Sequence, residues 1–328
     1  MKDIFHINLQ LFAEMNTNVT TDSGLSVENK TFYDMTLIDE ASPNLVHDQF
    51  GQKRPIPKNG GKKIEFRKFA SLPKATTPLT EGVTPDGKKL SASNIEAEVA
   101  QYGDYIVQSD VLELTSIDNT IVEATKILGR QAGLTLDTIT RNILQSGTNV
   151  FYAPKKDGTE VDSRAGLDAT CLLTVDVVKK VVAILRASNA PKINGDYVAI
   201  IHPYVAYDLM SDPAWIEAHK YAQPDNIYEG EIGKVAGVRF VETSEAKIYE
   251  GGVFGCLFLA DGAYGVTEIT GGGLETIIKQ KGSAGTADPL NQRSSIGWKA
   301  TKTAEILVDP YMVRVECKSA FSTDAEAN

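Results

Sequence analysis

Hydrophobic and polar residues alternate in two short segments in the first third of the chain. The stretch KKIEFRKF, residues 62–69, puts Ile64 and Phe66 on one face, and NIEAEVA, residues 94–100, alternates in the same way. A period of two residues is typical of half-buried strands. Between them, FASLPKATTPLTEGVTPDGKKLSAS contains three prolines, two glycines and few residues that could form a core. We therefore expect an extended β-hairpin over residues 62–108, with a long, turn-rich tip.

This predicted hairpin is too long to fold back onto its own domain. Arms of about 15–20 residues, at about 3.3 Å per residue, would reach roughly 50–65 Å. A compact chain of 328 residues has a radius of gyration of about 20 Å. The hairpin also has too few apolar residues to be buried, so we expect it to project from the subunit.

A period of three to four residues follows in LTSIDNTIVEATKILGRQAGLTLDTITRNILQSG, where Ile121, Leu128 and Ile139 recur on one face. This pattern predicts a long spine helix over residues 118–146, about 43 Å in length. Ser116 or Asp118 is a suitable N-terminal cap, and Gly147 is typical of a C-terminal stop. Glycines inside the helix, at positions 129 and 133, indicate close backbone packing.

From about residue 170 the chain alternates between helical and strand patterns. TVDVVKKVVAILRASNAP predicts an amphipathic helix, DYVAIIHP a buried strand, and YVAYDLMSDPAWIEAHKYA a helix in two pieces. VAGVRFVET and GCLFLADGAYGVTEI predict further strands. SSIGWKATKTAEIL and YMVRVECKSA also alternate, and they must return to pair with earlier strands. The pattern predicts an α+β fold in which the middle of the chain is inserted between outer parts that belong together.

The charge of the chain narrows the classes of function. The formal net charge is −10, and an acidic chain is a poor candidate for gripping nucleic acid, because phosphate contacts need clustered Lys and Arg. Cys171, Cys256 and Cys317 are odd in number and lie in apolar contexts, which indicates buried free thiols in a reduced cytosolic protein. No apolar run approaches the roughly 20 residues of a membrane span, and the N-terminus lacks the apolar centre of a secretory signal.

His202 is the strongest candidate for a catalytic residue, because Tyr204 and Asp208 lie nearby in the sequence. A histidine at a strand end before a proline is more often a structural hydrogen-bonding residue, and we favour that interpretation. The sequence contains no G-x-S-x-G nucleophile motif, no H-E-x-x-H or C-x-x-C spacing and no phosphate-binding loop. We therefore expect no catalytic residue, no metal and no cofactor.

The predicted hairpin is basic although the chain is acidic. From Lys62 to Ser91, its first strand and tip, the basic residues are Lys62, Lys63, Arg67, Lys68, Lys74, Lys88 and Lys89, and the acidic residues are Glu65, Glu81 and Asp86. A solvated loop is the simpler interpretation. The alternative is electrostatic steering onto an acidic patch of an identical neighbour, for which the candidate positions are Glu217, Asp225, Glu229 and Glu231.

The N-terminal stretch NLQLFA, residues 8–13, resembles the N-L-Q-x-F-A processing motif of a large-subunit ribosomal protein of low-GC Gram-positive bacteria. Some phages of these bacteria carry the motif on capsid and scaffolding proteins. The resemblance implies cleavage after Ala13, which would leave Glu14 at the new terminus. The alternative is that these residues are an ordinary flexible N-terminal segment that is not cleaved.

The order of arm, long hairpin, spine helix, inserted α/β part and returning strands resembles the tailed-bacteriophage major capsid protein, whose fold is shared with encapsulins. Five blocks resemble one phage capsid family in the right order: GKKIEFRKFASLPKATTPLTEGVTPDGKKLS, VAQYGDYIVQSDVLELTSIDN, IIHPYVAYDLMSDPAWIEA, GEIGKVAGVRFVET and SIGWKATKTAEILVDPYMVRVE. The resemblance implies a structural subunit of the icosahedral shell around a phage genome, with no catalytic site. An encapsulin-type non-viral shell protein is the alternative.

The resemblance also implies a division of the chain. We expect a cleaved segment (1–13), an N-terminal arm (14–61), the extended hairpin (62–108), a peripheral domain with the spine helix (109–169), an axial domain (170–290), and returning peripheral strands with a C-terminal tail (291–328). Contacts between subunits are expected at hairpin residues Arg67, Lys68, Lys74, Lys88 and Lys89. Some relatives crosslink a hairpin Lys to a neighbour's Asn, but the required Asn and Glu are not identifiable here.

The partners that the resemblance implies are other copies of the chain, as hexamers and pentamers in the virion. A separate scaffolding protein is expected because no long acidic helical scaffold segment occurs near the N-terminus. A portal and a decoration protein are further expected partners, with assembly in the host bacterial cytoplasm. Packaged DNA is expected to be contacted only non-specifically, and no membrane is involved.

Overall fold

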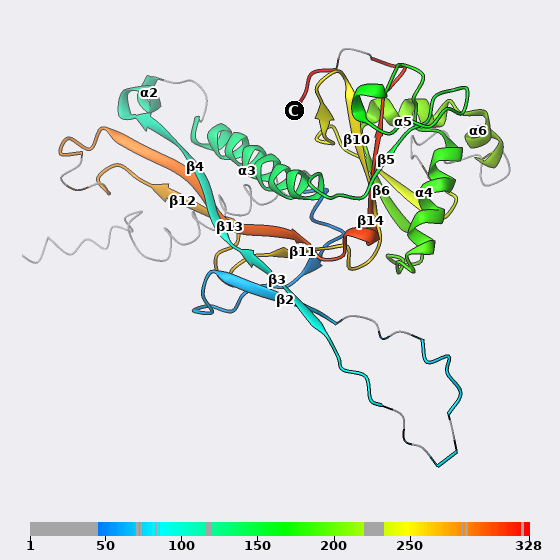
Figure 1. The fold of residues 1–328 in the computed structure, drawn as a ribbon. Coiled ribbons are helices and arrows are strands. Elements are labelled where there is room, and N and C mark those ends of the chain that lie inside the picture. The colour runs from blue at the N-terminus through cyan, green and yellow to red at the C-terminus, as the bar shows by residue number, and fades with distance from the viewer. Residues whose placement is uncertain are drawn as a thin grey trace, which may run out of the picture.

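The structure, a computed structural model, describes residues 45–328 except 70, 71, 73, 80, 83, 85, 116–119, 220–232, 284, 286, 287, 323 and 324. It has two bodies and one projection (Figure 1). One body is a sheet covered by a long helix, the other is a larger sheet with three helices, and the projection is the hairpin. None of the described helices is long and apolar enough to cross a membrane.

The first body is built on β13 (Arg293–Ile306). On one side β13 pairs antiparallel with β4 (Ala100–Ser109), from Arg293 opposite Ser109 to Lys302 opposite Ala100. On the other side it pairs with β12 (Glu275–Lys279) and β11 (Tyr264–Thr267). The short β1 (Gln52–Lys53) lies parallel to β11 and covers part of that edge. The sequence prediction that this strand returns to pair with an earlier one is confirmed.

The helix α3 (Thr120–Leu144) covers one face of this sheet and confirms the predicted spine helix. Leu128, Ala132 and Leu136 form a buried cluster with Ile296, Trp298 and Ala300 of β13. The proposed caps at positions 116 and 118 lie outside the described residues. A short helix, α2 (Asp110–Thr115), extends β4 at the end of the body far from the second sheet (Figure 1).

The second body contains a seven-stranded sheet among the described residues, in the order β5-β14-β10-β6-β8-β7, with β9 paired to β10. Its strands are β5 (Val150–Tyr152), β6 (Tyr197–Ile201), β7 (Lys234–Val235), β8 (Val238–Glu242), β9 (Ile248–Tyr249), β10 (Val253–Leu259) and β14 (Met312–Cys317). The helices α4 (Val175–Ala187), α5 (Pro203–Met210) and α6 (Pro213–His219) share its largest core cluster. The predicted amphipathic helix and the two-piece helix are confirmed.

The position of β14 differs from the expected return to the peripheral part. β14 lies between β10 and β5 in the second sheet. Val313, Val315 and Cys317 are fully buried there, and such a strand needs a central place in a sheet covered on both faces. Its buried Glu316 is held by Arg164 of the short 3₁₀ helix η3 (Arg164–Gly166), whose Nε and Nη2 each lie 2.6 Å from a carboxylate oxygen.

The hairpin is formed by β2 (Lys63–Phe69) and β3 (Ala92–Glu98), which pair from Lys63 opposite Glu98 to Phe69 opposite Ala92. Figure 1 shows it projecting from the junction of the two bodies. Its paired part is shorter than predicted, because the chain crosses at Val99 into β4 and joins the first sheet. The alternation after residue 99 therefore belongs to the ladder with β13.

The two bodies are joined by a third core cluster. Leu144 at the end of α3 packs with Ile200 and Leu259 of the second sheet and with Tyr264 of the first. The second 3₁₀ helix, η5 (Asp309–Tyr311), connects β13 to β14, and its Tyr311 packs against this cluster. The cysteines at 171, 256 and 317 are buried and free, as predicted.

Gly103 tests the close contact between β4 and β13. A methyl group at this position would lie 2.6 Å from the backbone oxygen of Trp298, so Gly103→Ala should lower the free energy of unfolding by about 1–3 kcal/mol. In the matched control Gly87→Ala, nothing lies within 4 Å of the added carbon, and stability should be nearly unchanged. Thermal unfolding of both variants measures this, and equal stabilities would contradict the close approach.

Candidate assembly surfaces

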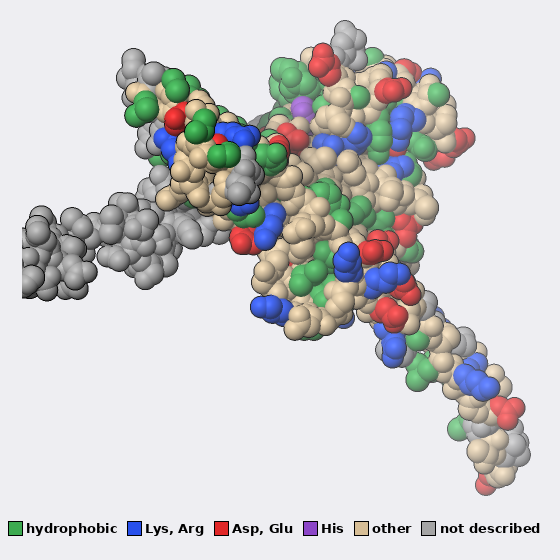
Figure 2. Space-filling view, turned by 90° about the vertical axis from the view of Figure 1, so that its left-hand side faces the viewer, with side chains coloured by type: hydrophobic (Ala, Val, Ile, Leu, Met, Phe, Trp, Pro, Cys, Tyr) green, Lys and Arg blue, Asp and Glu red, His purple; other side chains and the backbone are tan. Residues whose placement is uncertain are grey.

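The hairpin loop carries the site residues that the sequence singled out. Lys74, Lys88 and Lys89 are exposed in the loop, and Arg67 is exposed on β2. Lys68 lies on the same strand opposite Ser93. Figure 2 shows Lys and Arg side chains at intervals along the projection, with Asp and Glu side chains between them. Ala13 and Glu14 lie outside the described residues.

The same loop exposes large apolar side chains. Leu79 is 77% exposed, and Leu72 and Leu90 are more than half exposed as well. The loop leaves the body of the subunit, as Figure 1 shows, so the other described parts of the chain do not cover these leucines. An exposed segment that combines leucines with lysines is typical of an interaction surface.

The acidic positions proposed to receive the loop are only partly placed. Glu217 is exposed on α6, in the second body. Asp225, Glu229 and Glu231 lie outside the described residues. The structure of one chain does not bring the hairpin and Glu217 together, because they belong to different parts of the molecule (Figure 1).

A group of buried polar side chains anchors the segment that leads into the hairpin. His47 and Asp137 of α3 are both fully buried. The Nδ1 atom of His47 lies 2.6 Å from Oδ2 of Asp137, and the backbone N–H of His47 donates to Oδ1 at 2.7 Å. The hydroxyl of Tyr264 donates to the carbonyl of His47. The first turn of the described chain is thereby fixed to both α3 and β11.

The next residue forms a buried ion pair with β13. Asp48 accepts a hydrogen bond from Lys302 Nζ and another, at 2.6 Å, from the Thr140 hydroxyl. Lys302 also donates to the carbonyl of Leu136 at 2.9 Å. Burial lowers the pKa of Lys302, and the neighbouring Asp48 opposes this shift. Loss of either partner would leave the other without its hydrogen bond and counter-charge.

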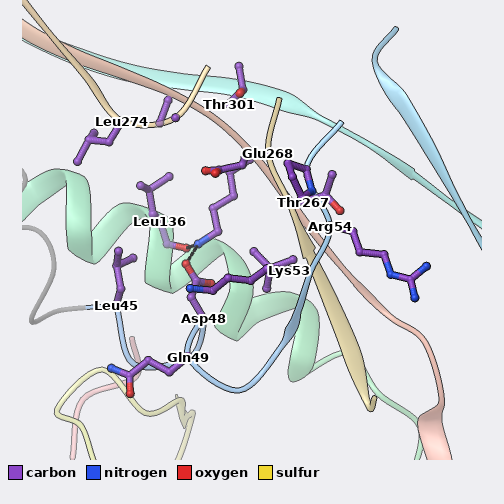
Figure 3. A pocket seen from close by; sticks show the side chains of 15 residues that line it. Leu45, Asp48, Gln49, Lys53, Arg54, Leu136, Thr267, Glu268, Leu274 and Thr301 are labelled. Carbon is purple, nitrogen blue, oxygen red and sulfur yellow. Dashed lines mark hydrogen bonds and ion pairs between the residues drawn. The ribbon is translucent and has the colours of Figure 1, made fainter. Parts of the chain in front are cut away.

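These groups line a cavity of about 330 Å³ between the N-terminal segment and the first sheet (Figure 3). Leu45, Leu136 and Leu274 form its apolar wall, and Asp48 lies beside them. Asp48 and Lys302 neutralise each other at the wall. We interpret the cavity as part of the joint between the N-terminal segment and α3. No local sequence pattern reveals this cavity, because Asp48 and Lys302 are 254 positions apart.

His202 has the structural role that the sequence favoured. It is the N-terminal cap of α5, and its Nδ1 accepts a hydrogen bond from the backbone N–H of Tyr204 at 3.1 Å. Burial lowers the pKa of His202. Asp208 accepts a hydrogen bond from the backbone N–H of Ala320 at 3.0 Å, and burial raises the pKa of its carboxyl. Both side chains thus bind backbone groups that shape the second body.

A further exposed apolar region lies at the far end of the first body. Val111 and Leu114 of α2 are exposed, as are Tyr105 and Val107 on the open face of β4. Figure 2, which looks onto this end, shows several hydrophobic side chains gathered there. This distal patch lies well away from the root of the hairpin (Figure 1). The chain therefore presents apolar surface at more than one of its extremities.

The sequence profile of a family described as phage capsid protein matches residues 93–314, which is more than half of the chain. The chain belongs to this phage capsid protein family. The match begins at the second strand of the hairpin and ends in β14, so it includes both bodies. A search of curated proteins finds no match.

Solved phage capsids share the fold. A chain of the cyanophage Pam1 capsid has a TM-score of 0.69 at 14% identity, covering 86% of this chain and 93% of that one. The capsid of cyanophage P-SCSP1u has a TM-score of 0.66 at 14% identity, with 84% and 89% covered. A virus-like particle from Pyrococcus furiosus has a TM-score of 0.51 at 12% identity, with 88% and 99% covered.

These comparisons confirm the α+β fold of tailed-phage capsid proteins and the capsid resemblance. The family is a phage family and the phage capsids superpose better than the Pyrococcus particle, so they outweigh the encapsulin alternative. A capsid protein has a structural role in the shell of a virion. The exposed hairpin and apolar patches are consistent with a subunit whose surfaces are completed by assembly.

Lys302 tests the buried ion pair of this capsid subunit. The change Lys302→Met leaves the Asp48 carboxylate buried without its cation, and we expect the free energy of unfolding to fall by about 3–5 kcal/mol. The control is Lys299→Met on the same strand, whose partner Glu275 lies at 3.0 Å in a solvent-exposed pair and should be worth no more than about 1 kcal/mol. Denaturant unfolding measures the loss of stability in both variants. Comparable losses in the free energy of unfolding would contradict the role of the buried pair.

His202 generates a prediction about pH. The pKa of His202 is lowered from 6.5 in the folded chain, so the unfolded chain binds more protons just below pH 6.5, and stability falls as the pH drops through this range. His202→Asn keeps an acceptor for the cap of α5 but removes the titration. We expect the variant to lose less stability than the wild type between pH 7 and pH 5, measured by denaturant unfolding at each pH. Parallel pH profiles would refute this.

Proposed function

We propose that this capsid protein builds an icosahedral shell around a phage genome, with hexamers and pentamers of the one chain as its units. The observation that carries the proposal is the hairpin. It projects from the body and exposes both Lys88 and Leu79. An exposed leucine is unfavourable in water, and contact with a neighbouring subunit would bury it. The phage capsid family and fold support the same function.

The proposed peripheral and axial domains correspond to the two bodies of the structure. The spine helix and the ladder of β4 with β13 support a peripheral domain, to which β11 and β12 contribute although they lie within the expected axial range 170–290. The second sheet and its helices support an axial domain over most of 170–259, to which β5 and β14 contribute from outside the expected bounds. We propose residues 14–61 as the arm and residues 62–108 as the hairpin segment rooted in β4.

We propose that the subunit acts without catalysis. The buried polar residues described above bind backbone groups or each other, which supports a purely structural role. Scaffolding, portal and decoration proteins are proposed as further partners, with assembly in the host cytoplasm and trimming after Ala13. Contact with packaged DNA is proposed to be non-specific, because a net charge of −10 disfavours phosphate binding.

Deletion of Lys74 to Lys89 tests the function of the hairpin. The two strands below the loop remain paired in the structure up to Phe69 opposite Ala92, so a short turn can rejoin them. We expect the variant to keep the thermal unfolding temperature of the monomer and to form no stable shells, as seen by electron microscopy and sedimentation. Wild-type protein assembled under the same conditions is the control. A deletion variant that assembles normally would refute the proposed function of the loop.

A further inference from the structure

Two positively charged side chains of helix α4 face a hollow on the surface of the second body. Figure 1 shows α4 flanking the second sheet on the side away from the first body. Lys179 and Arg186 are both exposed on this helix and line a hollow of about 550 Å³, which lies between α4 and the turn that joins β7 to β8. They are seven positions apart, so they lie on one face of the helix, about 10 Å apart along its axis.

A third cation reaches the same hollow from the loop after α4. A methyl group at Gly237, in the turn between β7 and β8, would lie 3.6 Å from Lys192 Nζ and 3.7 Å from Arg186 Nη2. The two cations therefore converge on the turn from different parts of the chain. Like charges that converge in this way repel each other, and an anion between them replaces the repulsion by attraction. We define the α4 basic cluster as Lys179, Arg186 and Lys192.

The carboxylates of α4 and of the following loop are already paired with other lysines. Asp176 lies 3.3 Å from Lys180, one turn along α4. Asp196 pairs with Lys234 of β7. Within the part of the chain that the structure describes, no member of the α4 basic cluster forms an ion pair. The cluster is thus an uncompensated positive site on a chain whose net charge is −10.

Lysines elsewhere in the two bodies show the contrast. Lys126 lies 3.1 Å from Glu123, and Lys155 lies 3.1 Å from Asp168. On β13, Lys299 is paired with a glutamate of β12 at 3.0 Å. Each of these cations has a carboxylate to offset it, so an external anion gains little from binding there. The α4 basic cluster has no such competitor among the described residues.

The lining of the hollow favours phosphate groups over a protein segment. Beside the cations it consists of Ala183, Ala236, Gly237 and the buried Val182. Along α4 and residues 234–239, which the structure describes throughout, no large hydrophobic side chain is exposed. A peptide-docking site needs an apolar or aromatic anchor. Phosphate contacts need instead positive charge and close approach, which alanine and glycine permit.

We propose that the α4 basic cluster is the site at which this subunit contacts the phosphate groups of packaged double-stranded DNA. The inference rests on the proposed function, because it requires a shell around a DNA genome. Arg186 and Lys192 hold one phosphate between them at the β7–β8 turn, and Lys179 contacts another along α4. The contact reads no sequence, since phosphate contacts carry no base information. It places the α4 side of the second body on the inner surface of the shell.

The strength of the contact follows from its composition. Three cations neutralise about three phosphates, so binding by one subunit is weak and sensitive to salt. Repetition of the cluster over the many copies of a shell strengthens the total attraction without any new contact. The acidic remainder of the chain limits this attraction. DNA is therefore held loosely at defined points and stays free to leave the particle.

Binding of a double-stranded DNA oligonucleotide to the purified subunit at low salt tests the cluster, with fluorescence anisotropy as the measurement. We expect the triple variant Lys179→Ala, Arg186→Ala, Lys192→Ala to lose about tenfold or more in affinity and to show a salt slope shallower by about 2–3. The control Lys126→Ala, Lys155→Ala, Lys299→Ala lowers the net charge equally at paired lysines and should lose much less. Both variants should unfold at the wild-type temperature.

Three results of this measurement would overturn the proposal. They are no DNA binding by the wild type at low salt, an equal loss of affinity in the two triple variants, and tighter binding of a polyglutamate peptide than of DNA to the same cluster. The last result would assign the cluster to an acidic protein partner.

DNA-filled particles supply a second readout of the same contact. Formaldehyde treatment followed by peptide mass spectrometry should find DNA adducts at Lys179 and Lys192 in filled particles, and none at these positions in empty shells. Adducts confined to other lysines would contradict the proposal while leaving the shell function intact. Failure of the shell function itself looks different, since wild-type protein would then form no closed particles.

Discussion

The ladder between β4 and β13 is the interaction on which the rest of the subunit depends. It joins residues 100–109 to residues 293–302, so the two ends of the long segment between them are held side by side. The same ladder supports the spine helix, which packs on Ile296 and Trp298. It also carries the hairpin, because β3 runs into β4 with only Val99 between them. Gly103 and Gly297 lack side chains where β4 and β13 come closest.

Buried charges make the joint between the N-terminal segment and this framework specific. Taking a carboxylate and an ammonium out of water is unfavourable unless both are paired and hydrogen-bonded. At Asp48 and Lys302 this condition is met by Thr140 and the Leu136 carbonyl, and the Asp137 carboxylate is bonded twice by His47. A slip of one residue in the 45–50 segment would leave both carboxylates unpaired. Apolar contacts from Phe50 alone would not fix the register in this way.

Local patterns predicted the elements, while long-range pairing decided where they lie. The alternation in β2 and β3, the period of α3 and the amphipathic face of α4 are all readable because each element buries its own apolar face. The end of the hairpin was placed too late, since β4 alternates equally well whether it pairs with β2 or with β13. The place of β14 was missed for the same reason. The His47 and Asp48 cluster left no local signal, because its partners lie on α3 and β13.

The distribution of exposed apolar side chains, more than any single residue, distinguishes this chain from a protein that functions as a monomer. A monomer has no use for leucines such as Leu79 at the end of a projection, nor for an aromatic ring such as Phe321 held open by tail hydrogen bonds. Each is an exposed apolar surface that contact with another subunit would cover. The hairpin loop is rich in lysine within a chain that is acidic as a whole. In a capsid the neighbouring subunits are the molecules that can cover such surfaces, and this links the fold of one chain to a shell.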